Sequence, residues 1–179
     1  PYFEIFDRQF LFLDGATAQG YRAVDIGTES PLPTVTGDWR VIRLAASETR
    51  FRSILSDLDL LNQFPDTPTN KNRARANHIF RTFMCETLTP STPSELTVDL
   101  PLPQDDPHGT DPDCVGCHYR LDPLARFFDR WRPPLPDATS TWFDASQAAN
   151  GTLIVRSDTG QSRVYEGTSE TDLARILKV

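Results

Sequence analysis

The 179-residue sequence contains only three cysteines, three histidines and one methionine. It has no apolar run of transmembrane length, so no membrane-spanning segment is expected. It also has no cluster of five or more lysines and arginines and carries a net charge of −7, which argues against a nucleic-acid partner. A chain of this length is expected to form one domain, or one and a half.

Two of the three cysteines and one histidine occur together, in the run Cys114-Val115-Gly116-Cys117-His118. This CxxCH spacing is the attachment signature of c-type haem. Thiols three residues apart lie on one side of a helical turn and can add across the two vinyl groups of one haem. The following imidazole is then held beneath the iron as its proximal ligand. The motif therefore predicts one covalent haem c, bound through Cys114 and Cys117, with His118 on the iron.

The same residues are also compatible with other chemistry. A CxxC pair can bind zinc, with His108 or Cys85 as further ligands, but a second CxxC or HxxxH is missing. A thioredoxin-like redox pair would need a βαβ pattern around it, and none is visible. A Cys114–Cys117 disulfide would leave His118 without a role. Cys85 is interpreted as a buried apolar thiol, with pairing to a cysteine on another chain, or on a further part of this one, as the alternative.

The predicted fold class is mainly α, with helices around one covalent haem and a small C-terminal β-hairpin. Residues 1–46 are expected to form an irregular segment with short strands, such as one over 39–44, and residues 47–179 the haem c domain. The haem motif should open a short helix. The other expected elements are helices over 47–64, 72–86 and 123–131, a Pro-rich loop over 87–113, a hairpin of 153–155 with 163–165 around a turn signal at 157–160, and a last helix after Ser169. In the helix over 72–86, the apolar stripe consists of Ala76, Ile79, Phe80 and Phe83, and the arginines Arg73, Arg75 and Arg81 are expected mostly on other faces. Asp122 is interpreted as the N-cap of the helix over 123–131.

Aspartates gather near the end of the Pro-rich loop and could together bind calcium. Their spacing matches no EF-hand loop, so they are interpreted as solvated loop carboxylates. The residues concerned are Asp105, Asp106, Asp111 and Asp113.

Several segments together resemble the planctomycete-type cytochrome c domain of large secreted bacterial haem proteins. The resemblance covers roughly residues 50–179, with Ala125 where glycine is usual. It implies a haem c domain but no particular reaction, and because members are generally longer at both ends it suggests a piece of a larger protein or assembly. The matching segments are 70–81, 83–85, the haem block 108–118, 121–125, and 144–146, Gly151, 165–167 and 172–174 of the tail.

The second axial ligand of the iron decides whether the site is closed or open. The sequence offers three candidates: His108 is ranked first, Met84 second and His78 third. Each has a plainer interpretation: His108 as a loop histidine near a propionate, Met84 as a core residue, and His78 as an ordinary helix histidine.

Side chains after the motif are expected to surround the haem. The aromatic group is interpreted as packing against the macrocycle, with ordinary core as the alternative, and consists of Tyr119, Phe127, Phe128 and Trp131. Three arginines are expected either to pair with haem propionates or to lie on an exposed helix face: Arg120, Arg126 and Arg130.

These expectations favour a monohaem c-type cytochrome that carries single electrons, for which bond-making catalysis is not required. Haem c is attached outside the cytoplasm in bacteria, so a periplasmic or extracellular location is expected. Redox proteins or neighbouring subunits are the expected partners, and an acidic carrier favours a basic patch on its partner. The alternatives are a haem enzyme or sensor with an open axial site, a subunit of a polymeric or multi-haem assembly, and a structural zinc module.

Overall fold

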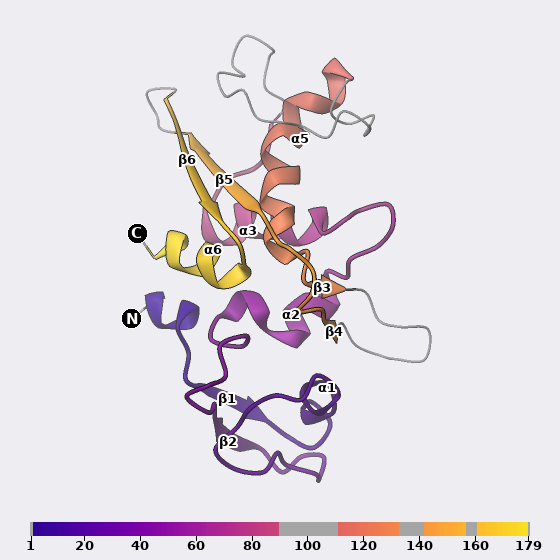
Figure 1. The fold of residues 1–179 in the computed structure, drawn as a ribbon, viewed down its shortest axis with the longest axis vertical. Coiled ribbons are helices and arrows are strands. Elements are labelled where there is room, and N and C mark those ends of the chain that lie inside the picture. The colour runs from indigo at the N-terminus through magenta and orange to yellow at the C-terminus, as the bar shows by residue number, and fades with distance from the viewer. Residues whose placement is uncertain (1, 90–110, 133–141, 157–160, 179) are drawn as a thin grey trace.

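The computed structural model describes residues 2–89, 111–132, 142–156 and 161–178 (Figure 1). Helices make up 38% and strands 18% of the structure. The described residues contain three two-stranded antiparallel sheets. The expectation of a mainly α fold is therefore wrong. Two further strand pairs, one near the N-terminus and one that begins at Trp131, add to the C-terminal hairpin.

An antiparallel strand pair near the N-terminus accounts for part of the difference from the expected fold class. Strand β1 (Phe10–Leu13) pairs with β2 (Arg40–Arg43) so that Leu11 lies opposite Ile42. The two-residue period buries Leu11 and Ile42 on one face and exposes the neighbouring side chains. The 3-10 helix η1 (Tyr2–Phe6) precedes this strand pair, and helix α1 (Ala18–Ala23) lies in the long connection between β1 and β2.

The expected helix over 47–64 is broken into η2 (Ile54–Ser56) and α2 (Leu58–Gln63). Ser53 and Asp57 both have extended backbones, and the side chain of each accepts a hydrogen bond from a backbone N–H two residues later, at 3.1 and 3.0 Å. Such side chains cap a new helical turn instead of continuing the previous one, which is why the apolar pattern alone overestimated the helix.

Helix α3 (Arg73–Phe83) confirms the helix expected over 72–86, although it ends three residues earlier. Ala76, Ile79 and Phe80 form its buried stripe, as the spacing indicated. Arg75 was expected on another face of this helix. It is instead only 2% exposed.

Helix α5 (Pro112–Ala125) carries the CxxCH motif and stands across α3 (Figure 1). A new helix was expected to begin at Pro123, with Asp122 as its N-cap. Pro123 instead lies inside α5, which passes directly into the 3-10 helix η4 (Arg126–Phe128). The Asp122 carboxylate bonds to side chains rather than capping a helix.

The C-terminal hairpin and last helix have the predicted form. Ser169 caps the helix, its hydroxyl accepting a 3.2 Å hydrogen bond from the Asp172 N–H. At the start of the hairpin Gly151 lies opposite Gly167, and a Cβ at Gly151 would fall 2.3 Å from the Phe127 ring. The elements are β5 (Gly151–Arg156), β6 (Ser162–Gly167) and α6 (Glu170–Leu177), preceded by the short pair β3 (Trp131–Arg132) and β4 (Trp142–Phe143).

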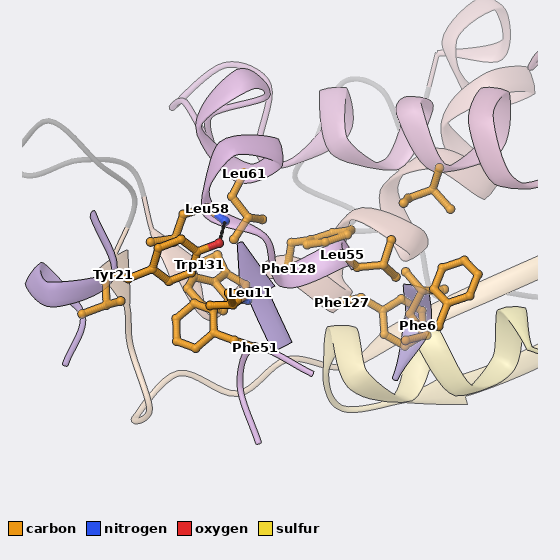
Figure 2. Close-up of a cluster of buried hydrophobic side chains, with 14 of the residues drawn as sticks. Phe6, Leu11, Tyr21, Phe51, Leu55, Leu58, Leu61, Phe127, Phe128 and Trp131 are labelled. Atoms are coloured by element: carbon orange, nitrogen blue, oxygen red, sulfur yellow. Dashed lines mark hydrogen bonds between the residues drawn. The ribbon is translucent and has the colours of Figure 1, made fainter. Parts of the chain in front are cut away.

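One hydrophobic cluster joins the N-terminal elements to the motif-bearing half of the chain. Figure 2 shows side chains from both parts in this core, where the ring centroids of Phe51 and Trp131 lie 5.4 Å apart. The Tyr21 hydroxyl accepts a 3.4 Å hydrogen bond from the Leu58 N–H within it (Figure 2).

The Arg75 guanidinium is embedded in this packing. It donates to the carbonyl oxygens of Phe64, Trp131 and Leu61 at 2.8, 3.0 and 2.9 Å, and to the Asn72 side chain at 2.7 Å. Two of these carbonyls belong to the end of α2, where the helix has no further N–H groups to offer them. Arg75 therefore joins α2, α3 and β3.

We expect Arg75→Met to reduce the free energy of unfolding by about 3–5 kcal/mol, because it leaves buried carbonyl groups without a donor. Arg81→Met is the matched control, since Arg81 is exposed on the same helix. Urea unfolding measures both variants. Equal effects of the two substitutions would contradict the structural role of Arg75.

Glu170 at the start of α6 is 2% exposed, and burial raises its pKa from the ordinary 4.5 to about 7. The folded state therefore retains a proton that the unfolded chain has already released. As pH rises from about 4.5 to about 7, this group should lower the free energy of unfolding by about 3 kcal/mol, at about 1.4 kcal/mol per pKa unit. Urea titrations across this pH range should show that Glu170→Gln removes the decline, whereas Glu166→Gln, at an exposed residue of β6, preserves it.

Candidate functional site

The CxxCH motif lies near the beginning of α5. The Asp111 carbonyl accepts the Cys114 and Val115 N–H groups at 3.0 and 2.9 Å, which starts the helix immediately before the motif. Cys114 and Cys117 are both half-buried, and their helical spacing places them on the same side of one turn. All three cysteines of the chain lie in the described part, and none forms a disulfide.

His118 is held by the residue one turn further along α5. Its Nδ1 lies 2.9 Å from Oδ1 of Asp122, and the His118 side chain is 18% exposed. Because an ionised carboxylate only accepts, Nδ1 carries the proton in a neutral imidazole. A metal at His118 would then be bound through Nε2.

Asp122 also receives two hydrogen bonds from α3. Arg73 donates from Nε to Oδ1 at 2.6 Å and from Nη2 to Oδ2 at 2.8 Å. Burial acts to raise the pKa of Asp122, but the hydrogen bonds from Arg73 and His118 outweigh it and the pKa is lowered below its usual 3.8. The carboxylate is thus kept ionised between a guanidinium and an imidazole.

This role of Asp122 was not predicted from the sequence, where its position before Pro123 indicated a helix N-cap. The signal was present, because a separation of four residues places Asp122 beside His118 on any continuous helix. The expectation that the helix would restart at Pro123 concealed it. The contribution of Arg73 comes from a different helix and has no local signal.

The candidates for a second axial ligand have different surroundings. His108 lies outside the described residues. Met84, directly after α3, is half-buried and packs against the hydrophobic core. His78 stacks on Phe64 with ring centroids 4.6 Å apart, and its Nδ1 lies 3.3 Å from the Thr82 hydroxyl. Burial, followed by the charge of Arg81, lowers the pKa of His78.

The aromatic residues after the motif are buried. Phe127, Phe128 and Trp131 lie fully inside the hydrophobic core, where protein side chains account for their packing. Tyr119 is 4% exposed, and the Arg156 guanidinium lies 5.7 Å from the centre of its ring. Of the group, Tyr119 lies closest in sequence to the motif, directly after His118 on α5.

Arg120 was expected to pair with a propionate or to lie on an exposed face. It is instead 4% exposed, forms an ion pair with Glu86, and donates to the Ile154 carbonyl at 2.9 Å. Its guanidinium also lies 4.8 Å from the ring centre of Phe80. Arg120 therefore ties α5 to β5 and to the residues that follow α3.

Cys85 differs from its expected state, because it is exposed rather than buried. It follows the end of α3 with a left-handed backbone (φ 52°), which turns the chain away from the helix. The half-buried thiols of the chain are therefore the two in the motif, Cys114 and Cys117.

The described residues contain no group of three histidine, cysteine, aspartate or glutamate side chains placed to hold a metal ion. Zinc bound only by protein ligands would need such a group. Haem c has a different requirement: the thiols bond to the porphyrin, and the iron takes one imidazole from the motif. The donor set of α5 fits this second arrangement. Of the aspartates considered for calcium, Asp105 and Asp106 lie outside the described residues.

Comparisons with family models, curated proteins and solved structures find no significant match for this chain. The resemblance to the planctomycete-type cytochrome c domain stays a prediction from the motifs. In the part of the chain that the structure describes, no helix combines the length and apolar character needed to cross a membrane.

Proposed function

We propose that the chain is an extracytoplasmic monohaem c-type cytochrome, as a domain or subunit, that carries single electrons. The observation that carries the proposal is the arrangement on α5. Two half-buried thiols and an imidazole share one helix, and the Nδ1 of that imidazole is engaged by Asp122. This arrangement supports covalent haem attachment with iron bound through Nε2 of His118.

Attachment needs no other reactant than the haem itself. Each S–H adds across one vinyl group, so that sulfur bonds to one vinyl carbon and hydrogen to the other, with no leaving group. Once bound, the haem supplies one-electron redox chemistry. The chain supplies the two sulfur attachments, the oriented imidazole, and a core that fixes α5.

The location and partners follow from the same proposal. Bacterial haem c is attached outside the cytoplasm, which supports the periplasm or the cell exterior. The net charge of −7 favours a redox partner, or a neighbouring subunit, with a basic docking surface.

For the second axial position we propose His108. Met84 packs against the core, and His78 is engaged by Phe64 and Thr82, which supports placing both behind His108. Two histidine ligands would give a closed site with a lower potential than a histidine–methionine pair.

Covalent attachment is tested by expressing the chain in a host that matures haem c. On a denaturing gel, the wild type should retain haem peroxidase staining and show a mass larger than that of its amino acids by one haem. The double variant Cys114→Ala/Cys117→Ala should lose both signals, and Cys85→Ala should keep them. A wild-type chain with the mass of the polypeptide alone would refute the proposal.

The axial ligand is tested on the haem-loaded protein. The spectrum of the oxidised protein should lack the near-infrared band of methionine ligation. Met84→Leu should leave the spectrum unchanged. His108→Ala should open the site, so that the ferrous protein binds carbon monoxide rapidly and fully. Rapid binding by the wild type would instead indicate an open-site enzyme or sensor, and a spectral change in Met84→Leu alone would indicate methionine ligation.

A further inference from the structure

We propose that Asp122 is the positioning residue for the His118 ligand and that Arg73, from a different helix, fixes the orientation of Asp122. Through this pair the fold would set the plane of the imidazole and the reduction potential of the iron. The inference rests on the proposed haem attachment and adds to it a contact that sets the orientation of the iron ligand.

The geometry leaves the carboxylate little rotational freedom. Oδ1 of Asp122 is shared by His118 Nδ1 at 2.9 Å and Arg73 Nε at 2.6 Å, while Oδ2 takes Arg73 Nη2 at 2.8 Å. A guanidinium that contacts both oxygens holds the carboxylate in one plane. The direction of the hydrogen bond to the imidazole is therefore fixed as well.

Solvent has limited access to this chain of contacts. The side chains of His118, Asp122 and Arg73 are 18%, 11% and 12% exposed. Hydrogen bonds between charged groups are stronger where water is largely excluded. The pair is therefore expected to influence the imidazole more than a surface ion pair would.

The position of Arg73 depends on the core rather than on α5. It is the first residue of α3 and also donates to the Thr69 carbonyl at 3.3 Å. Two residues later, Arg75 anchors the same helix through buried carbonyl groups. The orientation of the His118 ring is thus determined by packing between helices and not by the motif alone.

The electronic consequence has a definite sign. A carboxylate that accepts from Nδ1–H strengthens electron donation by Nε2, which favours ferric iron and lowers the potential. Arg73 Nε donates to the same carboxylate oxygen, Oδ1, and so weakens the influence of the carboxylate on the imidazole. Removing Asp122 and removing Arg73 should therefore move the potential in opposite directions.

The test uses the haem-loaded protein, with the potential measured by spectroelectrochemical titration and the ligand geometry by electron paramagnetic resonance of the ferric state. Asp122→Asn should raise the potential and shift the g-values. Arg73→Met should lower the potential and broaden the signal, because the carboxylate gains rotational freedom. Asp129→Asn is the matched control: Asp129 hydrogen-bonds to Asn72 and not to His118, so both readouts should stay close to the wild type.

Unchanged potential and g-values in Asp122→Asn would overturn the inference, as would an equal change in Asp129→Asn. Shifts of the same sign in Asp122→Asn and Arg73→Met would also overturn it. If Asp122→Asn does not fold, the sign of the Arg73→Met shift decides the matter. A wild-type protein without covalent haem is a separate result, because it removes the proposed function itself.

Discussion

A buried guanidinium organises the centre of this molecule. Arg75 is 2% exposed, and burial lowers its pKa to about 10. Such a charge is costly inside a protein unless its donors are satisfied. Here the donors reach the main-chain oxygens of Leu61, Phe64 and Trp131, which are distant in sequence, and the side-chain oxygen of the nearby Asn72. The ends of α2 and β3 are thereby held against α3.

The candidate site depends on the same junction. Arg73 lies two residues before Arg75, so the anchoring of α3 determines where the Arg73 guanidinium meets Asp122. Asp122 in turn meets His118 within α5. Helix α5 has a second fixed point, where Arg120 reaches Glu86 and the carbonyl of Ile154. The imidazole of the motif is thus connected to the interior through charged groups as well as through apolar packing.

Much of the local structure could be predicted from the sequence. The apolar spacing located α3, two segments of strand composition on either side of a turn signal located the C-terminal hairpin, and the cap at Ser169 located α6. The errors came from competition between local and distant interactions. Asp57 interrupts an apolar helical pattern, and Asp122 carries an N-cap signal that tertiary partners override. The motif itself needs only five residues to be recognised, whereas the support of His118 requires α3 and α5 to be placed together.

Two glycines at the open end of the C-terminal hairpin, Gly151 at the start of β5 and Gly167 at the end of β6, restrict the alignment of its strands. Gly151 and Gly167 face one another, and both backbones approach the Phe127 ring closely enough that a Cβ would lie 2.3 and 2.9 Å from its atoms. Sliding one strand by a single position would bring Thr152 or Glu166 into this space. The aromatic ring therefore selects one register, and the hairpin can dock on the helical half of the protein in only one way.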